Sequence, residues 1–369
     1  MDAKADRHDA VAREKRPGGQ GEEMTFLRRV AVAAFFVVGA ALVVAPPPVQ
    51  RAEAWLRYRL LREVPPPVLL GRNNRIFLAN HPGSPPNSLI TNVCGSSVDD
   101  TAVARAAAQI RLILEAARAI GVPVRFVIVP TAPRLYPEDL PLAYAHACDP
   151  PNVPAADRLV ALLHDPDVIY PLPLMLDLKT QFDVLPRHHF HWAGQGPLHV
   201  AEAVAEQMGL KRTLTLPLRN INRSSDLNSL NPGMGEHDRI RDPDLRAGGV
   251  TYCTGARCPD KLPGSILAYT RTQPAPGRIL VMADSFGDES GANFIEYAGR
   301  VWLLRMNVAI GEPAGLLAAT ALRTFKPDAI VIIYHDGSAL ALDAGSQASL
   351  AALGRLLNLG RDGISADRP

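Results

Sequence analysis

Apolar and polar positions along most of the chain follow two periods, one typical of helices and one typical of buried strands. Residues 101–121 (TAVARAAAQIRLILEAARAIG) carry apolar side chains at Val103, Ala106 and Ile110, a helical spacing that continues to a closing glycine. Residues 122–130 (VPVRFVIVP) form a continuous run rich in β-branched residues, the kind that is buried in a parallel sheet. The two segments together predict a helix followed by a buried strand.

The alternation continues towards the C-terminus. Further helices are predicted at 154–165, 196–209 and 314–325, and further strands at 71–80, 167–173, 277–286, 301–307 and 328–337. This order predicts a doubly wound α/β domain with a mostly parallel sheet over residues 68–340, followed by a C-terminal helix and tail over 341–369. Residues 217–262 are rich in Asn, Arg, Asp, Gly and Pro, break the pattern, and are expected to form an excursion over one end of the sheet.

The N-terminal segment follows neither period. Residues 1–25 are polar and predicted to be a disordered cytoplasmic tail, and residues 47–67, with two proline triplets, are predicted to be a stalk containing one short helix. Residues 26–46 are predicted to be a transmembrane helix, because an apolar run lies between Arg28–Arg29 and a proline triplet. The arginines place the N-terminus in the cytoplasm and the rest of the chain outside. A cleaved signal peptide and a buried core helix are the alternatives.

Charge and cysteine content limit the kinds of partner and indicate the state of the cysteines. The net charge is +2, without a basic stripe interleaved with aromatic residues, so we expect no nucleic-acid partner. Four cysteines in an exported domain favour two disulfides. Cys253 and Cys258 are close enough to close a small loop, which leaves Cys94 with Cys148. A zinc site at CTGARC is the alternative, although the second tight ligand pair is missing.

A candidate nucleophile follows one of the predicted strands. The stretch RILVMADSF runs from a buried strand into Asp284, Ser285 and Phe286, with a helix predicted next. Open α/β sheets place ligands at the carboxyl ends of their strands, and the start of a helix offers N–H groups to a developing oxyanion. Serine needs a base within hydrogen-bond reach to become a nucleophile. The alternative role of Ser285 is a helix N-cap.

The stretch RHHFHWAGQG supplies a candidate base. His191 is expected to take the proton from Ser285, with Trp192 packed beside the imidazole. In an extended segment His189 and His191 share one face and His188 points away. A zinc site is the alternative for three close histidines, but neither an HExxH motif nor a cysteine pair accompanies them, and no metal is expected.

HFHW followed downstream by ADSF resembles the alginate O-acetyltransferase family, which has a permuted SGNH-hydrolase-like domain and the pattern Asp-x-His-Trp and then Gly-Asp-Ser-Phe. Other segments fall in the order of the family. GRNNRIFL is similar to its first strand, FVIVPTAPRLYPEDLP to its proline and YPE segment, SSDLNSLNPG stands at its DL element, and FKPDAIVIIY is similar to its closing strand. The resemblance covers residues 71–336 and implies an SGNH-like fold.

Residue by residue, the resemblance implies that Ser285 accepts the acyl group and that His191 is the general base. His189 stands at the position of the family's aspartate. A neutral histidine can orient His191 but carries no negative charge to stabilise the imidazolium. The site is therefore either weakened, or completed by another carboxylate such as Asp183 or Asp284.

Three residues are expected to support the site. Asp284 is expected to fix the turn at the nucleophile rather than take part in the chemistry, and Trp192 to pack beside the base. Arg134 stands where the family more often has lysine. Ala283 replaces the glycine of the family's second block.

The resemblance implies an O-acetyltransferase that acts on a periplasmic or extracellular polysaccharide through an acetyl-serine. A carbohydrate O-acetylesterase and a catalytically weakened polysaccharide-binding or scaffold subunit are the alternatives. The expected partners are the polysaccharide acceptor and a membrane-bound acyl-transfer protein, and no cofactor is expected. The expected location is the inner membrane, with a single span and a periplasmic catalytic domain.

Overall fold

A seven-stranded sheet forms the centre of the computed structural model, which describes residues 47–64, 66–80, 84–95, 98–231 and 233–366. The order of its strands is β4-β3-β11-β9-β10-β8-β7. The strands are β3 (Val124–Val129), β4 (Val168–Ile169), β7 (Val250–Thr254), β8 (Ile266–Arg271), β9 (Arg278–Ala283), β10 (Arg300–Arg305) and β11 (Ala329–His335). The first five strands in this order run parallel, and β8 and β7 add antiparallel pairs at one edge. This confirms the predicted α/β fold with a mostly parallel sheet.

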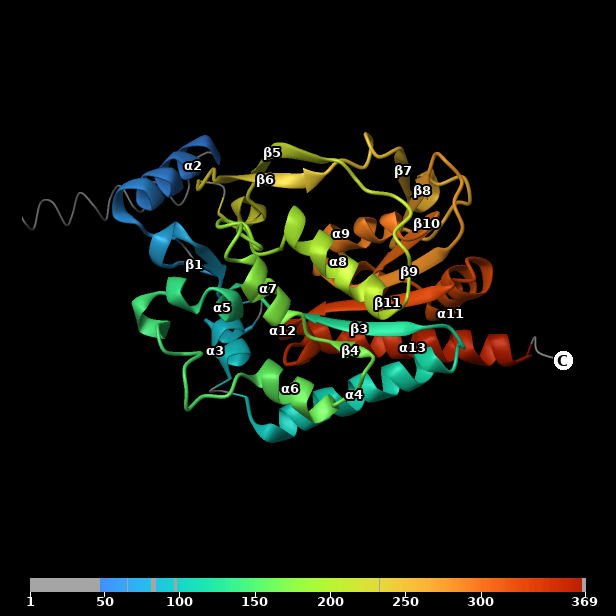
Figure 1. The fold of residues 1–369 in the computed structure, drawn as a ribbon. Coiled ribbons are helices and arrows are strands. Elements are labelled where there is room, and N and C mark those ends of the chain that lie inside the picture. Colours follow the sequence, from blue (N-terminus) through green and yellow to red (C-terminus); the bar gives the residue numbers. More distant parts are fainter. Residues whose placement is uncertain (1–46, 65, 81–83, 96–97, 232, 367–369) are drawn as a thin grey trace, which may run out of the picture.

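Helices cover both faces of the sheet (Figure 1). One face carries α4 (Asp100–Arg118), α6 (Ala155–Leu163), α11 (Ala314–Ala318) with the π-helical turn η8 (Ala319–Thr324), and α13 (Ala344–Ala366), with α4 and α13 side by side. The other carries α7 (Leu172–Leu178), α8 (Gln195–Gln207) and α9 (Ser285–Ser290). Side chains alternate along β11 between these two faces. Ile330 and Ile332 pack in the core under α4 and α13, and Val331 and Ile333 pack in the core under α7 and α8.

Shorter elements surround the sheet. They include α3 (Ser88–Cys94), α5 (Ala132–Leu135), α10 (Met306–Ala309), α12 (Asp336–Ala339) and the antiparallel pair β1 (Val68–Leu70) and β2 (Ile76–Leu78). Of these, α5, α10 and α12 follow the carboxyl ends of β3, β10 and β11. The loops at that edge are therefore replaced by short helices that fix the backbone near the strand ends.

The excursion of residues 217–262 contains more regular structure than the sequence predicts. It forms an antiparallel ribbon, β5 (Leu218–Ser224) with β6 (His237–Pro243), and then supplies β7. The ribbon is not part of the main sheet. Its strands alternate between half-buried and exposed side chains and are rich in Arg, Asn and Asp. This polar composition is why periodicity alone did not reveal them.

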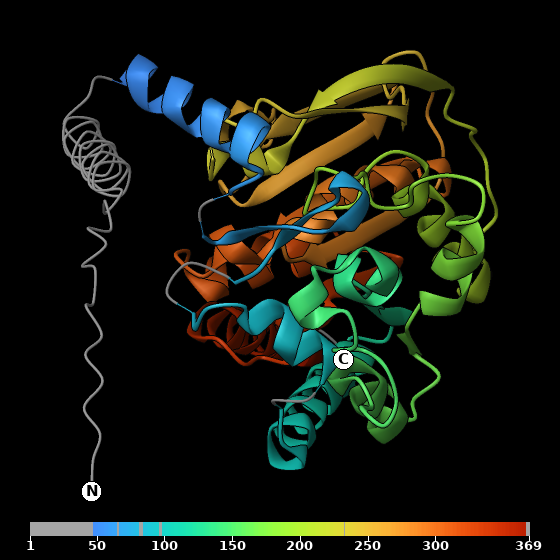
Figure 2. The ribbon, with the colours of Figure 1, turned by 90° about the vertical axis from the view of Figure 1, so that its left-hand side faces the viewer.

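The chain before the sheet packs against this ribbon. The helix α2 (Pro47–Leu56) continues into a π-helical turn, η1 (Arg57–Leu61), which buries Tyr58 and pairs Arg59 with Glu236 at 3.0 Å. Figure 2 shows α2 reaching from outside onto the β5–β6 ribbon. Among the described residues, no helix combines the length and apolar character that a membrane crossing requires. The predicted transmembrane segment, residues 26–46, and the predicted tail before it lie outside the described residues.

All four cysteines form disulfides. Cys94 at the end of α3 bonds to Cys148, and Cys253 in β7 bonds to Cys258, with Cα–Cα distances of 4.5 and 5.1 Å. These are the two pairs expected from the sequence.

Candidate active site

Ser285 lies at the carboxyl end of β9, where it is the first residue of α9. Asp284 is the N-cap of this helix, and its carboxylate accepts hydrogen bonds from the backbone N–H groups of Phe286 at 2.9 Å and His335 at 3.0 Å. The bond to His335 joins the turn to the neighbouring strand β11. Asp284 thus holds the turn that presents Ser285, the role expected for it.

The replacement of glycine by Ala283 is accommodated by Gly287. Ala283 is fully buried, and a Cβ atom at position 287 would lie 2.0 Å from its methyl group. Glycine at 287 therefore leaves the space that the alanine methyl occupies.

His191 lies over the turn at Ser285. Its ring centroid is 5.2 Å from that of Phe286, and the buried indole of Trp192 donates a hydrogen bond from Nε1 to the carbonyl of Phe286 at 2.8 Å. Atom Nε2 of His191 is buried and makes no hydrogen bond, to Ser285 or to any other described residue. The proton-transfer contact between Nε2 and Ser285 that the sequence predicts is therefore not formed in this structure, and catalytic hydrogen bonds are often long without substrate.

Asp226 orients the imidazole. It begins the short helix η5 (Asp226–Ser229) between β5 and β6, and its Oδ2 contacts Nδ1 of His191 at 2.6 Å. The same carboxylate accepts the backbone N–H groups of Phe190 and His191, both at 3.0 Å. Because a carboxylate only accepts, Nδ1 carries the proton and Nε2 is left as the basic nitrogen.

The pair is electrostatically coupled. Burial disfavours the imidazolium, but the hydrogen bond and negative charge of Asp226, with the charges of Glu289 and Asp284, outweigh it and raise the pKa of His191. Burial likewise opposes ionisation of Asp226, but His191 and the two backbone donors lower the pKa of this carboxyl below its usual value. The carboxylate is therefore charged when the imidazole accepts a proton.

His189 does not orient His191, which corrects the expectation from the sequence. Its Nδ1 contacts Asp238 in β6 at 2.9 Å and its Nε2 the carbonyl of Ser224 at 3.0 Å. Residues 187–191 turn rather than extend, with the N–H of His189 bonded to Pro186, so the expected alternation of side chains does not apply.

His188 also faces the ribbon. Its Nδ1 contacts the second oxygen of Asp238 at 2.9 Å, and its backbone N–H donates to the same carboxylate. Together the two histidines lower the pKa of Asp238 below its usual range, despite burial. His188 and His189 therefore fasten their segment to β6, and this fixes the backbone that carries His191.

Two other expected residues lie away from His191. Asp183 pairs with the buried Arg75 at 3.1 Å, and Arg134 in α5 pairs with Asp157 in α6 at 2.8 Å. Neither makes a recorded contact with His191 or Ser285. In the part of the chain that the structure describes, no three His, Cys, Asp or Glu side chains gather in a way that would hold a metal ion.

A cavity of about 360 Å³ opens beside Ser285. Three adjacent strands end there, and each places a polar residue in its wall: Ser285 after β9, Asn307 after β10 and Ser338 after β11. Oδ1 of Asn307 accepts the N–H of Val308 at 3.1 Å, and the hydroxyl of Ser338 contacts Nε2 of His335 at 2.8 Å. The sequence did not predict Asn307, Ser338 or Asp226, although Asp226 lies in SSDLNSLNPG, the segment that stands at the resembled family's DL element.

No protein-family model and no curated protein matches the chain. Several solved structures have a similar overall shape. A DHHW family protein from Eubacterium siraeum is 15% identical with a TM-score of 0.49, over 66% of this chain and 88% of the other. PatB1 of Bacillus cereus with a sulfonyl adduct is 10% identical with a TM-score of 0.49, over 74% and 97%. The O-acetyltransferase domain of AlgJ from Pseudomonas putida is 15% identical with a TM-score of 0.44, over 78% and 98%. At these values the likeness assigns no function to this chain.

Proposed function

We propose that the protein is an O-acetyltransferase that transfers an acetyl group to a polysaccharide hydroxyl through acetyl-Ser285. One observation carries the proposal: Nδ1 of His191 is held by Asp226, whereas Nε2 is buried without a partner above the turn that presents Ser285. An acid, a base and a serine in this relation are what nucleophilic acyl transfer requires. The HFHW and ADSF blocks support the same reaction.

In the first half-reaction Oγ of Ser285 attacks the carbonyl carbon of the acetyl donor, and its proton passes to Nε2 of His191. The leaving group takes that proton as its bond to the acetyl carbon breaks. In the second half-reaction the sugar hydroxyl gives its proton to Nε2 and attacks acetyl-Ser285. The proton then returns to Oγ as the serine leaves. Asp226 stays ionised throughout and stabilises the imidazolium in both steps.

Asn307 is the candidate stabiliser of the oxyanion. Its Oδ1 is bound to Val308, which leaves the Nδ2 amide as the donor that can serve the cavity shared with Ser285. Removing one oxyanion donor costs roughly 10²–10³ in kcat in the serine hydrolases where it has been measured. Asn307→Ala is expected to fall in that range.

The experiment is a mass measurement of the intact protein after incubation with para-nitrophenyl acetate. The wild-type chain is expected to gain one acetyl group, located at Ser285 by peptide mapping. Ser285→Ala and His191→Gln should gain none, and Ser290→Ala, a serine at the other end of the same helix, should behave as wild type. Acetylation that persists in Ser285→Ala would overturn the proposal.

The same acyl-enzyme serves an esterase if water replaces the sugar hydroxyl. The ratio of acetylated acceptor to free acetate separates the two enzymes. The other alternative is a weakened binding subunit, because His189 carries no negative charge. The contact of the Asp226 carboxylate with His191 supports an active enzyme instead.

We also propose that the domain works outside the cytoplasm, anchored by residues 26–46, and receives acetyl groups from a membrane-bound acyl-transfer protein. The apolar run behind Arg28–Arg29 and the two disulfides support this location. A reporter that works only outside the cytoplasm is expected to be active when it is fused after Pro369. Activity of a cytoplasm-specific reporter would contradict the location and leave the chemistry of Ser285 untouched.

A further inference from the structure

Large apolar side chains are exposed together on the α2–η1 segment, residues 47–61. Trp55 and Leu56 are each 47% exposed, Leu61 is 58% exposed and Leu60 is 70% exposed. All four lie in α2 or in the π-helical turn η1 that continues it. Apolar side chains scattered singly over a surface need no explanation, whereas a group of them marks an interaction site.

The opposite side of the α2–η1 segment is fixed to the domain. Ala54 approaches Gly233, in the β5–β6 connection, so closely that a Cβ atom on this glycine would lie 2.2 Å from the Ala54 methyl group. Tyr58 is buried. Positions four apart share one face of a helix, and positions two apart lie on nearly opposite sides. Because Ala54 and Tyr58 face the domain, Leu56 and Leu60 face away from it.

Arginines lie among these exposed apolar side chains. Residues 47–64 contain four arginines and two glutamates. Arg57 pairs with Glu53 at 2.8 Å, whereas Arg51 and Arg62 are exposed and have no carboxylate partner among the described residues. Leucines and a tryptophan next to arginines are typical of helices that lie in the headgroup region of a bilayer.

The α2–η1 segment also stands close to the proposed membrane anchor. α2 begins at Pro47, directly after residues 26–46. The helix from Pro47 to Trp55 is only about 12 Å long, so Trp55 stays near the bilayer surface in any direction of the helix. Figure 2 shows α2 at the outside of the molecule, where no other described element covers its outer side. A helix in this place is able to lie along the bilayer.

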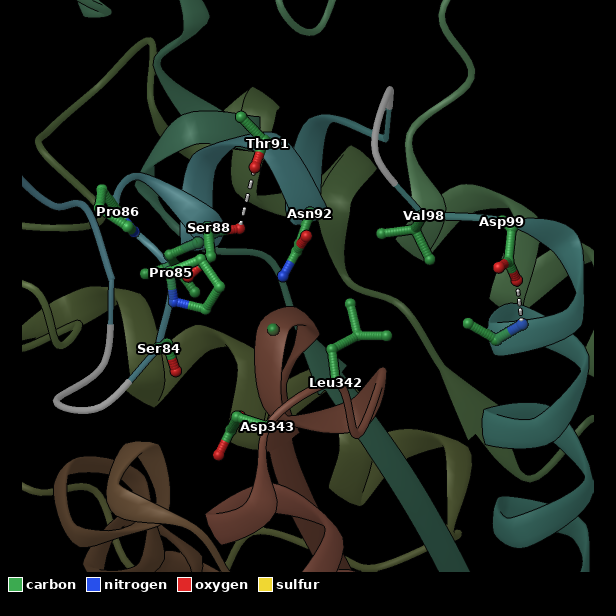
Figure 3. Close-up of a pocket in the computed structure, with 13 residues that line it drawn as sticks. Ser84, Pro85, Pro86, Ser88, Thr91, Asn92, Val98, Asp99, Leu342 and Asp343 are labelled. Carbon is green, nitrogen blue, oxygen red and sulfur yellow. Dashed lines mark hydrogen bonds between the residues drawn. The ribbon is translucent and has the colours of Figure 1, made fainter.

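A second copy of the chain is the rival occupant of this face. The described residues contain a hollow of about 440 Å³ between α3, the start of α4 and the α12–α13 connection (Figure 3), which has room for a leucine of another molecule. The exposed carboxylate of Asp99 lines it, and an apolar side chain there would take that charge out of water, which is unfavourable. A bilayer carries no such cost, because arginines reach the headgroups while apolar side chains lie below them.

We propose that the α2–η1 segment binds along the surface of a phospholipid bilayer, with Trp55, Leu56 and Leu60 at the level where headgroups meet acyl chains. The arginines of the segment lie at anionic headgroups. The proposal rests on the location proposed above and adds how the domain is held there. Because α2 is fixed to the ribbon that carries Asp226, this contact keeps the active site close to the membrane-bound acyl donor.

Tryptophan fluorescence of the full chain in phospholipid vesicles tests this contact. Of the three tryptophans, Trp55 is exposed and Trp192 and Trp302 are buried. The emission that Trp55→Phe lacks therefore belongs to residue 55. Lipids brominated near the headgroup end of their acyl chains should quench roughly half or more of this emission, since interfacial helices bury their apolar face at that depth. Iodide in the water should quench little of it.

Each other result contradicts the proposal in a different way. Strong quenching by iodide without quenching by the lipid would place Trp55 in water. Protection from both quenchers would mean that a protein, such as a second copy of the chain, covers it. A chain that does not float with the vesicles would contradict both the anchor and this contact. Acetylation of Ser285 by para-nitrophenyl acetate, measured on the same sample, tests the proposed function separately.

The double variant Leu56→Glu/Leu60→Glu tests which side chains make the contact. Both leucines are exposed, so the domain should stay folded, which thermal unfolding checks. Quenching of Trp55 by brominated lipid should fall about threefold or more, because a carboxylate is unfavourable at the acyl boundary. Leu112→Glu, at an exposed leucine of α4, is the matched control and should behave as wild type. Unchanged quenching in the folded double variant would overturn the proposal.

Lipid charge tests the arginines. Quenching by brominated lipid should be stronger in vesicles that contain phosphatidylglycerol than in vesicles of phosphatidylcholine alone, because anionic headgroups attract arginines. The difference should shrink at high salt, which screens exposed charges. Equal quenching in both kinds of vesicle at low salt would contradict the part of the proposal that places the arginines at anionic headgroups.

Discussion

Asp226 has three roles at the proposed active site. One carboxylate fixes the tautomer of His191, supplies the charge that stabilises its protonated form, and holds the backbone at Phe190 and His191. Loss of the charge therefore has two separable effects, a slower reaction and a lower imidazole pKa. These effects can be measured independently.

Asp226→Asn is expected to lower the rate of Ser285 acetylation by about 10²–10⁴, with the upper end set by the serine-protease precedent. The base works only when neutral, so activity rises with pH through the pKa of His191, which Asp226 raises. In the variant this pKa falls, and the acidic limb of the pH–rate profile should move to lower pH. A limb that stays in place would assign the pH dependence to another group. Asp177→Asn, on the exposed surface of α7, is the control.

His189→Asp would restore the motif of the resembled family but is expected to be harmful here. His189 is buried and uses both ring nitrogens, on Asp238 and Ser224. An aspartate would set a second carboxylate beside Asp238, and we expect a loss of about 3 kcal/mol in the free energy of unfolding, as for other broken buried pairs. Urea denaturation measures this. His189→Gln keeps hydrogen-bonding groups and should lose less free energy of unfolding. A faster acetylation of Ser285 in His189→Asp would instead favour the role expected from the sequence, in which residue 189 orients His191.

The sequence predicted Ser285 and His191 because each stands in a short motif next to a predicted element. It did not predict Asp226, because the contact joins positions 35 residues apart through a ribbon without clear periodicity. His189 was misassigned because an extended backbone was assumed where the chain turns. Local patterns indicate which residues are chemically able, whereas their pairing depends on long-range packing.

The β5–β6 ribbon carries Asp226, the proposed acidic residue of the site. It is fastened to α9 by the ion pair of Arg223 with Glu289 and to the histidine segment by Asp238. Gly194 also approaches it closely, at a φ of +70°, where a Cβ atom would lie 2.7 Å from the carbonyl of Arg241. The proposed nucleophile therefore follows β9, the proposed base precedes α8, and the proposed acid lies between the two strands of the ribbon.

Arg223→Gln is expected to loosen the ribbon without removing a catalytic group. We expect a threefold to tenfold lower acetylation rate, because a displaced acid orients the base less well, and faster amide hydrogen exchange over residues 218–243. Arg219→Gln in the same strand is the matched control, since Arg219 is more than half exposed and its contact to Asp244 is long, at 3.8 Å. Equal effects of the two changes would show that the ion pair with Glu289 is not what holds the ribbon.

The parallel strands and their covering helices were predictable, because buried β-branched runs and helical periods are local signals. The antiparallel edge was not. In β7 two of the five side chains are exposed, and β8 shows no clear alternation, so neither has the period that indicates a strand in sequence. Their place in the sheet is set by pairing with β10 and with each other.

Across the whole molecule, the two disulfides should contribute unequally to stability. Their sequence separations are 54 and 5 residues. From loop-closure entropy we expect about 4 kcal/mol from Cys94–Cys148 and about 2 kcal/mol from Cys253–Cys258. The double variants Cys94→Ser/Cys148→Ser and Cys253→Ser/Cys258→Ser, compared by urea denaturation, measure the difference. A larger loss of unfolding free energy in Cys253→Ser/Cys258→Ser would contradict the entropy argument. It would mean that this disulfide stabilises β7 by more than closing a short loop.

The order of strands in the sheet also has a consequence for the synthesis of the chain. β11 lies between β3 and β9, yet it is the last of the described strands in chain order. Without β11, the strands β3 and β9 have no common neighbour, and the sheet is divided into β4-β3 and β9-β10-β8-β7. The turn at Ser285 is fastened to the backbone of β11 through Asp284 and His335. The geometry proposed for Ser285 therefore requires a chain that extends at least through His335.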